Sequence, residues 1–566
     1  MFRSLRRPLQ SITLPGHAYP TSHPRYTFLL TRYYAKDSYH RDADIIVVGA
    51  GIAGVSASIA AAEKGASVVL VDSAHGGGAT AQSGGVVYAG GGTDQQKAAG
   101  YGHDTPENMF CYLKEETKGA VDDETLRAFC EGSVARLKWL ESHGAKFDAS
   151  LCPYKTSYPT DQYYLYYSGN EKSHPFNKVA KPAPRGHRTA HPGFSGGALW
   201  RPLFDSAMKL GVRFLPASKV DRLLLDTQGA PRGVEFKSLD PSSKLFRRHK
   251  TLTSWGKKFQ LALPEAADFL LNRADRIWCK GARPSSLMAP AVILSAGGFA
   301  FNPDMRQRYA PDFSKVAPLG TRGDDGSGIQ LGQSAGGSVD KMDNMSAWRF
   351  LYPPTALLEG VVVSQSGRRF SAEDVYGATL SNRMIRQHES KAFLVLDSTQ
   401  WAKAKDQLGK QTQSELFLQR LHSLVWEHMK APSIDSLANK ISVSAAALQE
   451  TIDAYNEAIH DGKEDPMKKE AEYCTPILKP PFYCLDISPK LKGVQTVHGL
   501  TLGGLRVDGK SGLVRRKDGT CVKGLYAAGR NAVGVCSNGY VSGLSIADGV
   551  FSGKRAAIHA VEQLQK

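Results

Sequence analysis

Residues 44–54 constrain the fold of this chain more than any other segment. Residues 44–48 read Asp-Ile-Ile-Val-Val, an apolar run that is typical of a parallel strand buried on both faces. Gly-Ala-Gly-Ile-Ala-Gly follows at residues 49–54, and a helical pattern continues to Gly65. Such glycines allow a tight turn, a close approach of backbone to a diphosphate, and close packing of helix on strand. The segment therefore predicts the first unit of a dinucleotide-binding fold, with a helix N-terminus facing negative charge.

A second apolar strand is predicted at residues 67–71, and it ends in Asp72. In a dinucleotide-binding fold, a carboxylate about 20 residues beyond the glycines can bind a ribose hydroxyl. A glycine motif alone is weak evidence. Here strand, turn, helix, strand and acid occur in the required order, so the sequence predicts nucleotide binding.

Two later segments indicate which dinucleotide is bound. Residues 524–530 read Gly-Leu-Tyr-Ala-Ala-Gly-Arg, a strand that runs into a glycine turn, and a helix is predicted from about Gly543. Residues 291–298 form a further strand that ends in Ser-Ala-Gly-Gly. Both segments resemble parts of FAD domains of the glutathione-reductase type, in which a second helix N-terminus reaches the isoalloxazine ring. The resemblance implies FAD rather than NAD.

Residues 76–85, Gly-Gly-Gly-Ala-Thr-Ala-Gln-Ser-Gly-Gly, form a loop of small residues suited to lie along a flavin. With this loop the chain resembles the fumarate reductase and 3-ketosteroid dehydrogenase flavoprotein superfamily over most of residues 42–560. Members with covalently attached FAD carry a histidine a few residues before the glycine pair. That place holds Gly77 or Gly78 here, and His75 comes too early. The resemblance therefore implies non-covalent FAD.

The same resemblance implies cofactor-binding positions in the glycine motif, at the strand ends, in the small-residue loop and at the start of the last helix. They are Gly49, Gly51, Ile52, Ala53, Gly54, Asp72, Ser73, Ala79, Ser83, Gly84, Gly85, Val220, Ala296, Gly297, Gly298, Ala528, Gly529, Leu544, Ser545 and Ile546.

The length of 566 residues predicts at least two domains, because a single core stops growing at about 250–300 residues. The resemblance implies an α/β fold: a Rossmann-like FAD-binding domain of the glutathione-reductase type, split by an inserted α+β catalytic domain. We expect a targeting or disordered segment at 1–40, FAD-binding parts at 41–302 and 481–566, and the catalytic domain at 303–480. Substrate would bind between the domains, where ligand sites are common.

The fumarate reductase branch of the superfamily is disfavoured by one position. Residues 367–370 read Gly-Arg-Arg-Phe, as in soluble fumarate reductases, which follow the subsequent glutamate with an arginine that delivers the proton. Here Glu373 is followed by Asp374, and the next arginine is Arg383. Fumarate reductase or another ene-reductase remains the alternative function.

The ketosteroid dehydrogenase branch is favoured by two tyrosines. These enzymes carry a tyrosine in the region of Tyr376 and another on the loop before the last flavin-contacting helix, where this chain has Tyr540 in Ser-Asn-Gly-Tyr-Val-Ser-Gly at residues 537–543. Enzymes that form a 1,2 double bond usually read Tyr-Pro-Gly-Ala-Gly there. The sequence found here is closer to the 4,5-type acting on 5α-reduced substrates, with the 1,2-type left open.

The resemblance assigns each catalytic residue a chemical role. Polarising a ketone acidifies the adjacent carbon, so a donor to that oxygen is required, and Tyr540 is the candidate, helped by a backbone amide near Leu544. Tyr376, relayed through Ser542, is the candidate base that takes the α proton while hydride leaves the β carbon. Tyrosine with a pKa near 10 is a poor base at neutral pH, so the site must either favour the tyrosinate form or pass the proton onward, and neighbouring hydroxyls would serve this. Tyr376 as a core residue, Ser542 as a helix N-cap, and Tyr352 as the base are the competing interpretations.

The formal charge of +17 is concentrated in two places. One lies before Asp37, the first acidic residue. The other spans residues 244–283, within a predicted basic insertion at about 242–288, where ten Lys and Arg face three acids among Trp and Phe residues. This insertion is either solvated or rests on an anionic membrane surface, where a lipophilic cyclic ketone could be met. Nucleic acid is not an expected partner, because no nucleic-acid-binding motif accompanies the charge.

The first 40 residues are rich in Arg and poor in acids, which is typical of a transit peptide and predicts a mitochondrial location. A cytoplasmic or membrane-associated location is the alternative. The eight cysteines show no CxxC pair and indicate reduced thiols in an intracellular protein. His187 and His191 lack further ligands at a metal-site spacing, so no metal is predicted. The electron acceptor that reoxidises the flavin is not identified by the sequence.

Overall fold

The computed structural model describes residues 41–260, 263–494 and 496–566. The targeting segment predicted at residues 1–40 lies outside the described residues. The structure contains the four strands predicted for the dinucleotide-binding fold. In three of them, β1 (Ile45–Val48), β2 (Val68–Val71) and β10 (Ala291–Leu294), every residue is buried. Burial on both faces explains why these segments are continuously apolar rather than alternating.

These strands form the centre of a six-stranded sheet in the order β20-β21-β10-β1-β2-β6. β1 pairs in parallel with β2 and β10, β10 pairs in parallel with β21 (Cys521–Ala527), and β2 pairs in parallel with β6 (Arg213–Leu215). Only β20 (Leu513–Arg515) runs antiparallel in this sheet. The carboxyl ends of β1, β2 and β10 therefore meet at one edge, where the predicted glycine turns lie.

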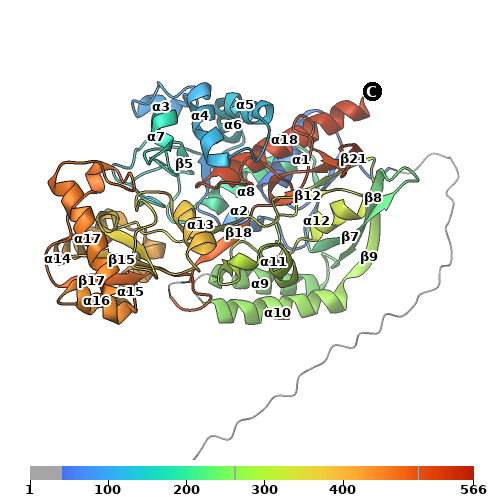
Figure 1. The fold of residues 1–566 in the computed structure, drawn as a ribbon. Helices are drawn as coiled ribbons and strands as arrows, with labels where there is room; N and C mark the ends of the chain where they lie inside the picture. The colour runs from blue at the N-terminus through green and yellow to red at the C-terminus, as the bar shows by residue number, and fades with distance from the viewer. Residues whose placement is uncertain (1–40, 261–262, 495) are drawn as a thin grey trace, which may run out of the picture. The chain divides into compact units, whose positions relative to one another are not determined.

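Two helices cross at that edge. α1 (Ile52–Glu63) follows β1, and α18 (Leu544–Leu564) is the last helix, beginning after Gly543 as the sequence predicts. Their backbones approach closely at Gly553, where an added Cβ atom would lie 2.3 Å from the carbonyl oxygen of Ala53. Figure 1 shows the pair side by side, next to β21. Both helix N-termini are thereby held near the carboxyl ends of the parallel strands.

A second sheet, in the order β14-β15-β17-β16, is wholly antiparallel. Its strands are β14 (Val361–Ser364), β15 (Ala392–Leu396), β16 (His428–Ala431) and β17 (Phe482–Asp486), and α14 (Ser398–Gln411), α15 (Ser414–Val425), α16 (Ile434–Ile441) and α17 (Ala445–His460) surround it (Figure 1, orange). β17 comes after residue 480, the last residue of the predicted catalytic domain, and pairs with β15 and β16. The chain thus combines a parallel sheet with a separate antiparallel one, as expected for a mixed α/β protein.

The predicted basic insertion is a helical hairpin. α9 (Lys244–Phe259) and α10 (Pro264–Gly281) lie side by side (Figure 1, green). They connect β8 (Pro231–Ser238) to β9 (Arg283–Met288), which form an antiparallel sheet with β7 (Ser218–Leu225). The Ser243 hydroxyl accepts a hydrogen bond from the Phe246 amide and caps α9.

Two small sheets carry residues of the site. One holds β3 (Val86–Tyr88), β5 (Gly186–Arg188) and β4 (Leu165–Tyr166), and the other holds β11 (Ala317–Pro318), β18 (His498–Thr501) and β13 (Met345–Trp348). The remaining elements are α2 (Gly78–Gln82), α3 (Asp94–Ala98), α4 (Pro106–Thr117), α5 (Asp123–Glu131), α6 (Ser133–Ser142), α7 (Phe176–Val179), α8 (Gly196–Lys209), α11 (Pro303–Tyr309), α12 (Ser327–Ser334), α13 (Gly377–Gln387), β12 (Val339–Asp340) and β19 (Gly504–Leu505).

Within the described residues, no helix has the length and apolar character needed to cross a bilayer. The eight cysteines are all unpaired, and Cys130, Cys152, Cys484 and Cys536 are buried.

Candidate active site

The end of β2 is organised around Asp72. Its carboxylate accepts hydrogen bonds from the amides of Ala50 (2.9 Å), Ala74 (2.9 Å) and Gly76 (3.0 Å). Asp72 therefore ties the glycine turn after β1 to the loop after β2. Three backbone amides already donate to this carboxylate. The predicted contact of Asp72 with a ribose hydroxyl stays a prediction.

Two side chains that the sequence motifs did not single out also hold the glycine turn. Thr80 on α2 accepts a hydrogen bond from the Ile52 amide at 3.1 Å, and the Trp200 indole donates to the Ala50 carbonyl at 2.9 Å. Thr80 lies inside the small-residue loop. Trp200 is 150 residues from its partner, so no local pattern could have indicated it.

The glycines of the other motifs are required by close packing. An added Cβ atom would lie 2.4 Å from the Tyr158 ring at Gly84 and 2.4 Å from Asp324 Oδ1 at Gly297. Asp324 is itself paired with Arg530, Oδ1 to Nη2, at 2.6 Å. The loop at residues 83–85 and the turn after β10 are thus shaped by neighbouring protein segments.

Tyr540 lies on the loop that precedes α18. Its side chain is buried and stacks on Trp348, with ring centroids 5.6 Å apart. Burial raises the pKa of Tyr540 to about 12, and a hydrogen bond with Ser545 opposes part of this rise. The hydroxyl is therefore protonated at neutral pH, which is the state a donor to a carbonyl oxygen requires.

Tyr376 and Ser542 are brought together with a third hydroxyl. The Tyr166 hydroxyl on β4 donates to Ser542 Oγ at 3.0 Å, and Ser542 is also a neighbour of Tyr376 that lowers its pKa. Tyr166 is fully buried and lies 376 positions from Ser542 in the sequence. The competing interpretation of Ser542 as an N-cap is wrong, because Gly543 caps α18 and no side chain takes part.

The surroundings of Tyr376 disfavour its tyrosinate form. Burial and the neighbouring tyrosines, Tyr540 first among them, raise its pKa well above the ordinary value, and Ser542 opposes this only in part. Tyr376 could act as a base by forming tyrosinate or by passing a proton onward. The hydroxyl cluster fits the onward transfer of a proton.

Two elements of the sequence-based site are placed differently in the structure. The Leu544 amide, expected to help bind the ketone oxygen, donates to the Val541 carbonyl at 3.1 Å as part of the loop that leads into α18. Tyr352, the rival base, is buried beyond Phe350 and has the Lys155 ammonium 5.7 Å from its ring centre. Burial, and Asp374 after it, raise the pKa of Tyr352 well above its usual value.

Asn170 fixes the backbone at Tyr376. Its side-chain oxygen accepts a hydrogen bond from the Tyr376 amide at 2.6 Å, and its Nδ2 donates to Glu116 at 2.8 Å. The Ser542 amide in turn donates to the Ser168 carbonyl at 3.1 Å. The short segment after β4 therefore holds both parts of the hydroxyl cluster.

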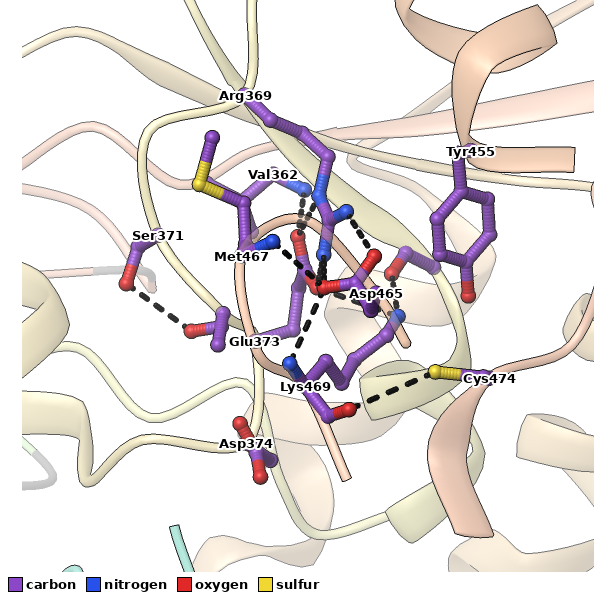
Figure 2. A network of polar contacts seen from close by, with 12 residues as sticks. Val362, Arg369, Ser371, Glu373, Asp374, Tyr455, Asp465, Met467, Lys469 and Cys474 are labelled. Atoms are coloured by element: carbon purple, nitrogen blue, oxygen red, sulfur yellow. Dashed lines mark hydrogen bonds and ion pairs between the residues drawn. The ribbon is translucent and has the colours of Figure 1, made fainter. Parts of the chain in front are cut away.

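On the other side, the segment leading to Tyr376 is anchored by a buried ion network (Figure 2). Glu373 accepts hydrogen bonds from Arg369 Nη2 (2.7 Å) and the Val362 amide (2.7 Å), and pairs with Lys469 at 3.2 Å. Arg369 also pairs with Asp465 at 2.6 Å. Two cations and two carboxylates thus neutralise each other out of water. The Arg and Glu that resemble fumarate reductase at this point have a structural role here, and Arg383 donates to Ser371 instead of reaching the tyrosines.

A family model for the FAD binding domain matches residues 44–545. The chain belongs to the FAD binding domain family. FAD is therefore the cofactor of this flavoprotein, as the three motif regions imply.

Three relatives refine the comparison. A 3-oxo-5-alpha-steroid 4-dehydrogenase from Comamonas testosteroni is 36% identical over 498 residues, which cover 86% of this chain and 92% of that protein. The crystal structure of 3-ketosteroid-Δ4-(5α)-dehydrogenase from Rhodococcus jostii RHA1 in complex with 4-androstene-3,17-dione matches with a TM-score of 0.77 and 31% identity, covering 93% of this chain and 98% of that one. A cytochrome-type fumarate reductase from Shewanella frigidimarina is 25% identical over 93% of this chain and 78% of that protein. The resemblance to this superfamily, and to its ketosteroid branch, is confirmed.

The residues at the edge of the parallel sheet fit a bound dinucleotide. An added Cβ atom at Gly51 would meet nothing nearer than Thr80 Oγ1 at 3.8 Å, so the start of α1 is open to a ligand. In the described part of the chain, the buried Gln82 Nε2 on α2 has no hydrogen-bond partner and can serve one. Two helix N-termini, those of α1 and α18, favour the negative charge of a diphosphate and of a reduced flavin.

The remaining predicted cofactor positions are distributed around this edge. Ser73, Ala79, Ser83 and Gly85 lie in or beside the loop after β2, Val220 is buried in β7, Ala296 and Gly298 follow β10, Ala528 and Gly529 follow β21, and Leu544, Ser545 and Ile546 form the first turn of α18. Their individual contacts with FAD stay predictions.

His187 and Tyr158 have structural partners. His187 Nε2 lies 2.8 Å from Thr93 Oγ1, and burial lowers its pKa to about 4. Tyr158, in the dense run of tyrosines, donates to the Gly84 carbonyl at 2.8 Å. Among the residues that the structure describes, no group of three His, Cys, Asp or Glu could hold a metal ion.

Loss of the Glu373 charge is expected to destabilise this flavoprotein by about 3–5 kcal/mol, because Glu373→Gln leaves two buried cations with one carboxylate. Thermal unfolding of the holoenzyme followed by circular dichroism measures the effect. The double variant Glu373→Gln/Lys469→Met restores neutrality and should recover part of the lost stability. Equal melting temperatures for Glu373→Gln and the unmodified protein would contradict a role for the network.

Proposed function

We propose that this flavoprotein is a dehydrogenase that introduces a carbon–carbon double bond next to the ketone of a 3-oxosteroid or a related triterpenoid. The observation that carries the proposal is the cluster of Tyr540, Tyr376, Ser542 and Tyr166 hydroxyls directly before the N-terminus of α18. A protonated donor and a chain of hydroxyls are what removal of an α proton from a ketone requires.

In the proposed mechanism, Tyr540 donates a hydrogen bond to the ketone oxygen and stabilises the enolate-like charge that develops there. Ser542 Oγ takes the α proton as its own hydroxyl proton passes to the Tyr376 oxygen, and Tyr376 releases its proton to water. The Tyr166 hydroxyl, which donates to Ser542 Oγ, orients this relay. When bound, FAD supplies the acceptor for the hydride that leaves the β carbon. The Trp348 and Phe350 rings, which contact the rings of Tyr540 and Tyr376, offer flat apolar surface to a fused-ring ligand.

The substrate class and bond position rest on the relatives together with the Tyr-Val-Ser-Gly sequence at residues 540–543. The relative that is 36% identical is a 4-dehydrogenase of 3-oxo-5α-steroids. We therefore place the new double bond at the 4,5 position, with 1,2-desaturation as the other outcome of product analysis. In the same scheme, the parallel sheet is a Rossmann-like FAD-binding domain, and the antiparallel sheet with α14–α17 belongs to an inserted catalytic domain.

Anaerobic titration of the purified holoenzyme with a 5α-reduced 3-ketosteroid tests the proposal. Loss of the oxidised-flavin absorbance band, and a 4-ene product, are the expected results. A 1-ene product would correct the bond position alone. If reduced flavin is reoxidised by fumarate, and no 3-ketone bleaches the oxidised form, the steroid assignment is wrong and the fumarate reductase alternative stands.

The basic hairpin α9–α10 supports a second partner, an anionic membrane surface. Trp255 and Phe269 are 48% and 62% exposed, and they lie among the basic residues of the hairpin. Aromatic side chains among cations are suited to the interface of an anionic bilayer, where a lipophilic ketone would be delivered. The protein is then expected to sediment with vesicles containing phosphatidylglycerol and not with pure phosphatidylcholine. Trp255→Ser/Phe269→Ser should weaken sedimentation, whereas Trp426→Ser, which removes another exposed tryptophan (67%), should not.

The location of the protein is also a proposal. The Arg-rich, acid-poor composition of residues 1–40 supports delivery to mitochondria. If these residues are fused to a fluorescent protein and the fusion is found in the cytoplasm, the proposed location is wrong.

The acceptor that reoxidises the flavin is to be identified by mixing reduced holoenzyme with quinones or with oxygen and comparing the rates of flavin reoxidation.

A further inference from the structure

The inner side of hairpin α9–α10 contacts the loop that follows β2. The Lys257 ammonium on α9 donates to the Gly76 carbonyl at 3.3 Å. Two turns earlier on α9, the Nδ1 atom of His249 lies 3.0 Å from the Nε2 atom of His75. Gly76 and His75 stand between Asp72 and α2, so the hairpin covers a segment that the family uses for its cofactor.

The same hairpin is fastened to a second loop, at residues 320–322. Gln260 donates to the Gly320 carbonyl at 3.0 Å. Arg322 forms ion pairs with Asp268 and Asp275 of α10, both at 2.8 Å. Each exposed pair alone is worth little, but one arginine held by two carboxylates gives a fixed position.

These two loops lie next to each other at predicted cofactor positions. An added Cβ atom at Gly323 would lie 3.6 Å from Ser73 Oγ, and one at Gly320 would lie 3.7 Å from the Ala79 Cβ atom. Since the hairpin binds both loops, it closes the outer side of the site near the end of β2.

Lys257 brings a positive charge into this closed region. Among the described residues, its ammonium makes a single hydrogen bond, to a carbonyl, and burial lowers its pKa while the Asp72 carboxylate opposes the shift. Asp72 is already engaged with three amides. The Lys257 side chain is partly buried. Charges withdrawn from water are normally paired, so Lys257 has capacity for an anionic partner. The adenosine diphosphate end of FAD, whose ribose is expected at Asp72, carries the only cofactor charges that could supply it.

We infer that hairpin α9–α10 is part of the FAD site, and that Lys257 binds the adenosine diphosphate end of the cofactor. The hairpin joins two strands of a sheet outside the glycine motifs, so no dinucleotide fingerprint includes it. Its inner face serves the cofactor, whereas Trp255 and Phe269 are exposed.

The test is FAD binding to the apoprotein, measured by quenching of flavin fluorescence and by the rise in melting temperature that FAD produces. Lys257→Met keeps the length of the side chain and removes its charge. We expect the Kd for FAD to rise about tenfold or more, as for loss of one hydrogen bond to a charged group. ADP, used as a competitor, should lose affinity by a similar factor. Lys257→Arg should retain most of the affinity.

Lys258→Met is the matched control, because it removes an exposed charge from the neighbouring position of the same helix. An unchanged Kd in Lys257→Met, an equal loss in Lys258→Met, or weaker FAD binding with unchanged ADP competition would each overturn the inference. If Lys257→Met does not fold, Gln260→Ala provides the second route: it loosens the hairpin from Gly320 and should speed FAD dissociation. Unchanged dissociation there would overturn the closing role of the hairpin. None of these measurements depends on the steroid activity.

Discussion

Replacement of Tyr540 by phenylalanine is expected to lower kcat/KM for a saturated 3-ketosteroid by about 10²–10³-fold, the usual cost of removing one oxyanion-hole donor. The substitution removes only the hydroxyl and leaves the ring on Trp348, so the packing of the loop before α18 is retained. Anaerobic stopped-flow measurement of flavin reduction reports the chemical step directly. The effect should fall on the rate of reduction rather than on substrate affinity, because the hydrogen bond strengthens as charge develops on the ketone oxygen.

The pH dependence follows from the same residue. Burial raises the pKa of Tyr540 to about 12, so the donor form is present at neutral pH and is lost only as the pH rises through that value. No loss of activity between pH 7 and 9 should arise from Tyr540. FAD content is the control, since Tyr540→Phe should bind FAD as the unmodified protein does. A variant that reduces its flavin at an unchanged rate would remove Tyr540 from the mechanism.

The strands of the parallel sheet and the last helix could be predicted because their signals are local. β1, β2 and β10 are short apolar runs, as expected for strands buried on both faces, and β21 ends in a glycine turn. The sequence predicts the start of α18 within one residue of its observed position, since Gly543 ends the loop before it. The resemblance supplied Tyr376, Tyr540 and Ser542, but only their sequence positions.

What could not be predicted depends on contacts between distant segments. Tyr166 belongs to a run of tyrosines in which nothing distinguishes it, and only the pairing of β4 with β5 brings it to Ser542. Asn170 and Trp348 reach the site in the same way. Lys257 is one of ten cations in its segment, and the fold alone separates it from Lys258. Burial of Tyr376 also depends on distant segments, and it raises the pKa of this tyrosine, which disfavours its tyrosinate form.

The hydroxyl cluster yields the second prediction with a large effect. Ser542→Ala and Tyr376→Phe should each lower the rate of flavin reduction by about 10²–10⁴-fold, the range of general base catalysis. Because Ser542 contacts both Tyr376 and Tyr166, either substitution interrupts the same path for the proton. The double variant should therefore be little slower than the slower single variant, since groups that act as a unit are not additive.

Exchange of the substrate α hydrogen with heavy water separates proton removal from hydride transfer and shows which step each residue serves. Tyr540→Phe and Ser542→Ala should both slow exchange, one by weakening the acidity of the carbon and the other by removing the acceptor. Tyr352→Phe is the discriminating control, because Tyr352 is the rival base and lies beyond Phe350. If Tyr352→Phe abolishes exchange while Tyr376→Phe does not, the base is Tyr352, and the proton leaves toward Lys155 and Asp374 rather than through Ser542. The hydroxyl geometry requires near-normal exchange in Tyr352→Phe and loss of exchange in Tyr540→Phe and Ser542→Ala.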